Sequence, residues 1–257
     1  MSWSRSTTLM RQNWELLMAD PAPIVLLTAM PLVMMTFLQG TGKAVLQSAG
    51  YQNVSGAELV VPGMAVMFAF FGVGFIGTAF FSEHGWGTWD RLRASQATTL
   101  EIVLGKILPS ALLMLIQLAF IFAIGIVCFG MTVRGSMAGV GVMILACIGL
   151  LVAFSMLLTA TLRTANQLMA VVNLAAMVFA GIGGALAPID VLPQWAQTLA
   201  PLSPAYWMLK GFREVILEGR GVDATIVPAG MTLLFAAVMA AVAMLRFNVT
   251  DEKVFDT

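Results

Sequence analysis

The sequence predicts an all-α membrane protein with six transmembrane helices. Of its 257 residues, 60% are hydrophobic and only 10% are charged, whereas a soluble domain carries about 25% charged residues. Six long runs hold no charge at all, and each exceeds the roughly 20 residues that a helix needs to cross a hydrocarbon core. Since lipid offers no hydrogen-bond partners, the backbone in these runs must be helical. The expected spans, all in one domain covering residues 1–257, are 21–42, 59–82, 107–133, 135–162, 164–189 and 224–245.

An amphipathic helix is expected before the first span, lying in the plane of the lipid headgroups. Its apolar face would comprise Trp3, Met10, Trp14, Leu17 and Met18, and its polar face Arg11, Gln12, Asn13 and Glu15. Acidic residues precede the first apolar run and no clear cleavage site follows it, which does not fit a secretory signal. The first run is therefore expected to stay as a span.

The second run contains GVGFIG, residues 72–77, which has the spacing of a dinucleotide-binding turn. That turn requires a preceding strand and a following helix in a soluble unit, and neither fits inside a membrane span. Small residues in membrane helices let neighbouring backbones approach closely, so we interpret these glycines as a helix-packing surface. A phosphate-binding G-x-x-x-x-G-K-[ST] motif is also absent from the sequence, and we expect no ATP site on this chain.

The cysteines and the histidine indicate neither a disulfide nor a metal site. Cys128 lies near the end of one run and Cys147 well inside the next, so their depths in the membrane should differ. We expect buried, unpaired thiols. His84 has no partners for a metal site, and the balance of 13 basic and 13 acidic residues, without a basic cluster, gives no indication of a nucleic-acid partner.

The longest connection, residues 188–223, is expected to form a helical outer segment. Pro193, Pro201 and Pro204 would interrupt a spanning helix, so we expect no seventh span over residues 191–209. Ser203 is expected to cap a helix that begins at Pro204 and that Gly219 ends. The apolar face of this helix would comprise Met208, Leu209, Phe212, Val215 and Ile216, and its polar face Lys210, Arg213, Glu214 and Glu218. This amphipathic pattern favours an interfacial or re-entrant helix.

The six runs contain only mildly polar side chains: Gln117, Ser155, Thr159, Gln167 and Asn173. An ion-driven carrier keeps an ionisable group inside the membrane, and an enzyme needs a cluster of reactive side chains. Neither is present in the runs. Each of the five polar residues either forms a helix-to-helix hydrogen bond or lines a polar pathway, and the sequence leaves both alternatives open.

The inner segment, residues 83–106, reads EHGWGTWDRLRASQATTLEIVLGK. Its pattern permits a helix from residue 87 to residue 104. Trp86 and Trp89 are either contact anchors for a partner protein or anchors at the lipid headgroups. A partner that supplies energy could act on this segment.

The inner segment resembles the signature of the membrane subunits of ABC type 2 exporters, which include the antibiotic and daunorubicin-type permeases. The matching residues are Glu83, Gly87, Thr88, Asp90, Leu92, Ser95, Glu101, Gly105 and Lys106. Gly85 and Gln96 depart from the family pattern, which has a second acidic residue and a proline there. The stretch SPAYWMLKGFREVILEG, residues 203–219, is also similar to the family.

The resemblance implies that a coupling helix in the inner segment contacts a separate ABC ATP-binding subunit, which holds ATP and Mg. Trp89 and Leu92 would pack against that subunit, and Asp90, Arg91 and Arg93 would pair with its charges. A second permease, identical or paralogous, would complete a dimer with the substrate path between the two. This chain would then be no enzyme itself.

The charge-free spans fit an apolar or amphipathic substrate such as a drug, an antibiotic or a lipid. The alternatives are a non-transporting scaffold or signalling subunit and, less favoured, a secondary carrier. Lysine and arginine positions set orientation, and a cytoplasmic N-terminus puts eight of the 13 on the inner side. We therefore expect both termini in the cytoplasm and, from the resemblance, a place in a bacterial inner membrane.

Overall fold

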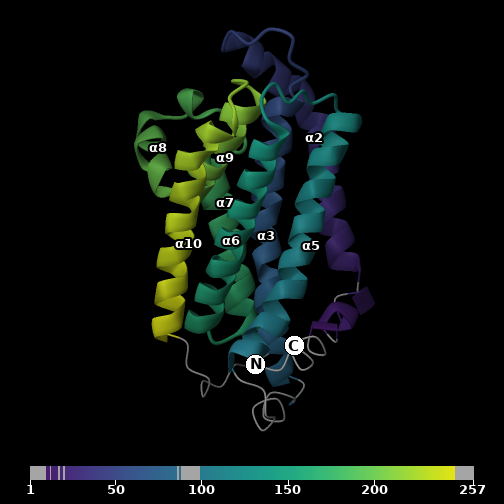
Figure 1. The fold of residues 1–257 in the computed structure, drawn as a ribbon, viewed down its shortest axis with the longest axis vertical. Coiled ribbons are helices and arrows are strands. Elements are labelled where there is room, and N and C mark those ends of the chain that lie inside the picture. Colours follow the sequence, from purple (N-terminus) through teal and green to yellow (C-terminus); the bar gives the residue numbers. More distant parts are fainter. Residues whose placement is uncertain are drawn as a thin grey trace.

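The chain folds as a bundle of long helices (Figure 1). The computed structural model describes residues 10–11, 13–16, 18–19, 21–85, 87 and 99–246. The long helices are α2 (Ala22–Ser48), α3 (Ala57–Gly85), α5 (Thr99–Val127), α6 (Met137–Thr161), α7 (Ala165–Gly183) and α10 (Ile226–Arg246). Within the described residues, six helical stretches are long and apolar enough to cross a membrane, and all elements are helices. The predicted all-α protein with six spans is confirmed.

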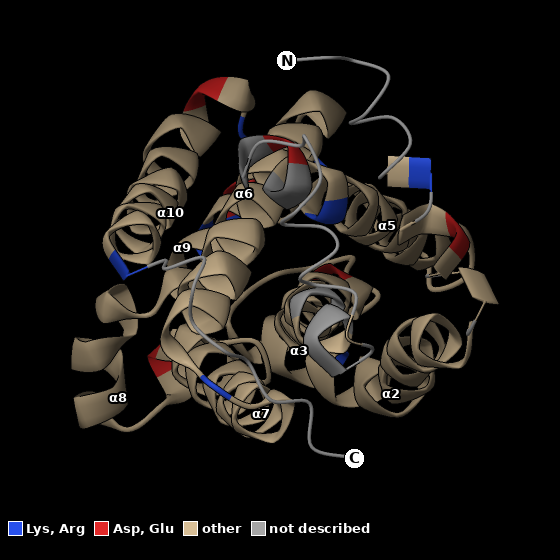
Figure 2. Cartoon of the chain, turned by 90° about the horizontal axis from the view of Figure 1, so that it is seen from below, with Lys and Arg blue, Asp and Glu red and all other residues tan. Residues whose placement is uncertain are grey.

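Successive long helices run in opposite directions, so the start of α2 and the end of α10 lie together (Figure 1). We call this the terminal end and the opposite one the capped end. Helix α3 is the central helix: it packs against α2, α5, α6 and α7, and Val61, Phe70 and Val73 along it are fully buried. Viewed along the bundle, α2 and α7 lie on either side of α3 (Figure 2).

The glycines of GVGFIG form a packing surface on α3, as predicted. A Cβ atom on Gly74 would lie 2.7 Å from the Met169 sulfur, and one on Gly77 would lie 2.5 Å from Leu168 Cδ2. Both neighbours belong to α7. Only the missing side chains allow α7 to lie this close to α3.

Residues 188–225 form short helices at the capped end, on one side of the bundle (Figure 1). These are η1 (Ile189–Val191), α8 (Gln194–Leu199), η2 (Ala200–Leu202), α9 (Pro204–Ile216) and η3 (Val222–Thr225). Helix α9 packs against α3, α6, α7 and α10. Its 13 residues are about 20 Å long, too short to span a membrane. Its depth relative to the membrane surface stays a prediction.

Helix α9 begins at Pro204 as expected, but its capping, its end and one face differ from the expectation. Ser203 does not cap the helix; its hydroxyl donates to the carbonyl of Phe179 on α7 over 2.9 Å. The helix ends at Ile216, before Gly219. Glu214, expected on a solvated face, is only 9% exposed because long helices pack around more than one side of α9.

The third span was also wrongly bounded. Helix α5 begins at Thr99 and ends at Val127, whereas the uncharged run covers residues 107–133. The chain turns at Gly130, which has a φ of +66°, and Met131 N–H donates to Gly125. Cys128 therefore lies beyond the helix and is exposed, which corrects the expectation of a buried thiol; Cys147 is buried, and both thiols are free.

We predict that replacing glycine by alanine lowers the stability of the protein at a closely packed position but not at an open one. In Gly63→Ala the new Cβ collides with the carbonyl oxygen of Ala185, so the substitution should cost about 1–3 kcal/mol of stability. Gly141→Ala, on α6 with no atom within 4 Å, should be neutral or gain up to about 1 kcal/mol. Thermal unfolding in detergent measures both, and equal midpoints would contradict the close approach at Gly63.

Candidate functional site

The predicted coupling segment joins α3 to α5 at the terminal end (Figure 1). Glu83 lies in the last turns of α3, and Gly87 has a φ of +65°. Glu101 and Lys106 lie in the first two turns of α5, where both side chains are buried. The remaining residues of the expected contact fall outside the described part of the chain: Thr88, Trp89, Asp90, Leu92 and Arg93.

The helical residues that precede α2 contact the start of α5. Asn13, expected on a solvated face, is buried instead, and its Nδ2 donates to the carbonyl of Gly105 over 3.2 Å. Arg11 and Glu15 are exposed as expected and form an ion pair of 2.9 Å. The residues before α2 are thus tied to the end of the predicted coupling segment.

Two of the polar residues inside the spans join neighbouring helices. Gln117 Nε2 on α5 donates to the carbonyl of Leu27 on α2 over 3.1 Å. Ser155 Oγ on α6 donates to the carbonyl of Val73 on α3 over 3.3 Å. Both side chains are buried, which favours helix packing over pathway lining at both positions.

Gln167 belongs to the start of α7. Its backbone N–H donates to Thr164 Oγ1 over 3.1 Å, and its Oε1 accepts from the N–H of Arg163 over 3.2 Å. This reciprocal arrangement satisfies amides that a helix start leaves without intrahelical partners. Gln167 is exposed, so capping α7 is compatible with lining a polar pathway.

Asn173 is exposed on α7, as Gln167 is, but it lies in the middle of the helix and not at its start. Its neighbours there are Leu174 and Met177, which are 65% and 67% exposed. Among the described residues its side-chain amide has no hydrogen-bond partner. It is thus a polar group in the middle of a span on an otherwise apolar surface.

Glu58 is a buried charged residue that the sequence analysis missed. It lies in the first turn of α3 and is 2% exposed. Its carboxylate accepts five hydrogen bonds of 2.9–3.3 Å, from the N–H and hydroxyl of Ser55, the N–H of Gly56, and the N–H and hydroxyl of Thr132. It therefore joins the start of α3 to the loop between α5 and α6.

The sequence contains a pattern that indicates a structural role for Glu58. Ser55 and Glu58 have the S-x-x-E spacing of a capping box ahead of an apolar run. Glu58 stands one position before the uncharged run and therefore lies outside the expected span. The structure places it inside the helix.

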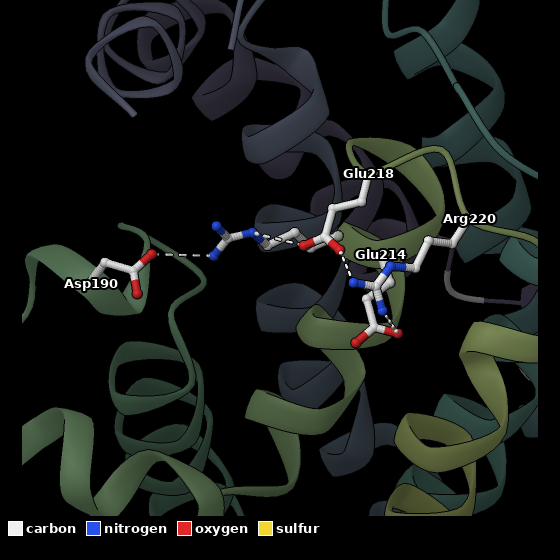
Figure 3. A network of polar contacts seen from close by, with 5 residues as sticks. Asp190, Glu214, Glu218 and Arg220 are labelled. Atoms are coloured by element: carbon white, nitrogen blue, oxygen red, sulfur yellow. Dashed lines mark hydrogen bonds and ion pairs between the residues drawn. The ribbon is translucent and has the colours of Figure 1, made fainter. Parts of the chain in front are cut away.

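Charged residues of the capped end form a chain of ion pairs (Figure 3). Arg213 lies 3.4 Å from Asp190 and 3.8 Å from Glu218, and Arg220 lies 3.1 Å from Glu218 and 4.0 Å from Glu214. Burial alone would lower the pKa of Arg213, but a hydrogen bond with Tyr51 and the negative charge of Asp190 raise it above its ordinary value. The guanidinium therefore stays charged and fastens η1 to α9.

A cavity of about 400 Å³ lies beside this chain of ion pairs. The end of α2, the start of α3, the end of α7, η1 and α9 form its walls. Both apolar and charged side chains line it, among them Val45, Leu59, Tyr51, Lys210 and Arg213. Among the described residues no group of three or more His, Cys, Asp and Glu side chains is placed to hold a metal ion.

Comparison with known families identifies the class to which this six-helix membrane domain belongs. The family model described as ABC-2 type transporter matches residues 3–217. The chain belongs to this family. The match covers the helices α2 to α7 and the whole of α9.

Named relatives include two bacterial permeases. The chain is 28% identical over 158 residues to the linearmycin resistance permease protein LnrN of Bacillus subtilis (strain 168), covering 62% of this chain and 41% of the relative. It is 27% identical over 173 residues to the probable multidrug ABC transporter permease YbhR of Escherichia coli (strain K12), covering 66% and 47%. The matched part thus spans less than half the length of each relative.

We predict that Glu58 and Thr132 stabilise the protein jointly. Glu58→Gln removes the charge from five hydrogen bonds, and Thr132→Val removes one donor to it. Hydrogen bonds to charged groups contribute about 1.5–3 kcal/mol, so each single variant should unfold at lower temperature. The double variant should lose about 1–2 kcal/mol less than the sum. Additive losses in thermal unfolding would show that the two residues act separately.

Proposed function

We propose that this chain is the transmembrane subunit of an ATP-driven exporter that moves apolar or amphipathic molecules out of the cytoplasm. Membership of the ABC-2 type transporter family, over residues 3–217, carries the proposal. The relatives named as linearmycin resistance and multidrug permeases support a drug, antibiotic or lipid-like substrate. The apolar spans agree with such a substrate, since the middle of each span carries no charge and the carboxylate of Glu58 at the start of α3 is occupied by five hydrogen bonds.

Energy would come from a separate ATP-binding subunit, which would hold the ATP and Mg that this sequence has no motif to bind. The contact would be the segment from Glu83 to Lys106, which leaves α3 and returns into α5. Helix α3 packs against four other membrane helices. A push on its end would therefore reach most of the bundle, and Asn13 would link the helical residues before α2 to the same movement.

The substrate path would lie between two copies of the permease, along the exposed side of α7. An amide without a partner in hydrocarbon loses hydrogen bonds that water would supply, so Asn173 is costly on a lipid-facing surface. Against a second copy it can pair with a polar group or face a hydrated path. Glycine and mildly polar residues are the usual contact groups between membrane helices.

The capped end would face outward and the terminal end the cytoplasm, in a bacterial inner membrane. The even number of spans puts the start of α2 and the end of α10 on one side. The excess of lysine and arginine on that side supports a cytoplasmic location. The coupling segment then lies where an ATP-binding subunit can reach it.

The coupling role predicts that Trp89→Ala and Arg93→Glu weaken binding of the ATP-binding subunit. Truncating an anchor aromatic commonly costs about 2 kcal/mol or more, which corresponds to roughly 30-fold in affinity. Pull-down of the partner and substrate-stimulated ATPase activity measure the effect. Trp195→Ala, which removes an exposed tryptophan of α8 at the opposite end, is the matched control. Normal assembly and stimulation in both test variants would exclude the coupling role.

The path along α7 predicts contact between two Asn173 side chains or their neighbours. In a background with Cys128→Ser and Cys147→Ala, a cysteine at position 173 should cross-link two copies in membranes through a short bifunctional reagent. Val238→Cys, on the exposed side of α10, should not cross-link because α10 lies on another side of the bundle (Figure 2). Cross-linking at 238 but not at 173 would move the interface away from α7.

A further inference from the structure

The cavity at the capped end has the composition of a site at the membrane–water interface. The sequence contains only two tyrosines, and both of them, Tyr51 and Tyr206, line this cavity. Trp207 stacks edge-on against Tyr206, and its indole N–H donates to Pro201. Tyrosine and tryptophan concentrate where lipid headgroups meet water, so we infer that the cavity lies at headgroup depth.

The carboxylates that line the cavity already have partners within the described residues. Glu58 accepts five hydrogen bonds. Asp190 and Glu218 pair with Arg213, and Glu218 and Glu214 pair with Arg220. Their negative charge is therefore held in place around the cavity.

Lys210 differs from these carboxylates. It lines the cavity and is half-buried, yet it forms no ion pair with any carboxylate of the described residues. Its Nζ lies 5.2 Å from the centre of the Trp207 ring, a contact that orients the ammonium group without neutralising it. An anionic group of a ligand would complete its surroundings.

We propose that this cavity binds one phospholipid with a free ammonium headgroup, as in phosphatidylethanolamine. Lys210 would hold the phosphate as an ion pair. The lipid ammonium would lie toward Asp190 and Glu218, whose second lone pairs remain available to further donors. The glycerol and upper acyl segments would lie along Val45, Leu59 and Pro62, which form the apolar wall.

The charge of the lining selects this class of lipid over others. Four carboxylates, Lys210 and Arg213 line the cavity, and Arg220 pairs with two of the carboxylates from outside the lining. Four negative charges thus stand against three positive ones, which disfavours a headgroup that carries only negative charge. A choline headgroup has positive charge but no N–H to donate. Free phosphate would lack the apolar part that the wall accommodates. This binding is independent of whether the chain transports substrate.

Lipid titration followed by native mass spectrometry tests the proposal. Phosphatidylethanolamine, phosphatidylcholine and phosphatidylglycerol with identical acyl chains are added to delipidated protein in detergent. We expect the first to bind at least about tenfold more tightly than the other two, since a charge-assisted hydrogen bond is at stake. Equal binding of the three lipids would overturn the proposal, as would displacement of bound lipid by inorganic phosphate.

Two variants locate the binding. Lys210→Ala should weaken phosphatidylethanolamine binding about tenfold, and Val45→Trp should weaken it by filling the apolar wall. Lys43→Ala, which removes an exposed lysine of α2 outside the cavity, should leave it unchanged. A wild-type thermal midpoint checks that each variant is folded. Unchanged binding in a folded Lys210→Ala or Val45→Trp variant would place the lipid elsewhere.

Discussion

The carboxylate of Glu58 connects the parts of the capped end on which the fold depends. It fastens the start of the central helix α3 to Thr132. The loop that carries Thr132 then supplies the N–H groups of Arg134 and Gly135, which donate to the carbonyls of Ile216 and Val215 at the end of α9. A helix end buried among membrane helices needs such partners. Glu58 thus holds the loop between α5 and α6 against the start of α3, and the backbone of that loop satisfies the last carbonyls of α9.

Different contacts hold the two ends of the bundle. At the capped end, ion pairs join η1, α9 and the residues after α9 to one another. Backbone hydrogen bonds join the end of α9 to the loop between α5 and α6, and Ser203 joins the start of α9 to α7. At the terminal end, a long segment leaves α3 and returns into α5, and Asn13 ties the residues before α2 to it. Between the ends, glycines at van der Waals distance and single amide or hydroxyl contacts hold the helices. Polar contacts are therefore concentrated at the two ends of the bundle, where water can also serve as a hydrogen-bond partner.

The sequence predicted the six spans and the glycine packing because both depend on composition along one helix. It also identified α9, whose amphipathic pattern and Pro204 are local features. The errors arose where tertiary contacts decide. Ser203 bonds to Phe179 of α7 instead of its own helix, and the uncharged residues 128–133 turn back because Thr132 is held by Glu58. A run without charges shows where lipid is tolerated, but it does not show where a helix ends.

Gln117 and Asn173 show that the same limit applies to the residues expected to line a substrate path. Both are amides inside uncharged runs, and no feature of the sequence separates them. Rotation of each helix about its axis decides their roles, and neighbouring helices set that rotation. The Gln117 amide donates to a backbone carbonyl of α2, whereas the Asn173 side chain is exposed and has no hydrogen-bond partner among the described residues. Since hydrocarbon offers no hydrogen bonds, the contact with α2 accounts for the Gln117 amide, whereas no described residue accounts for the Asn173 amide.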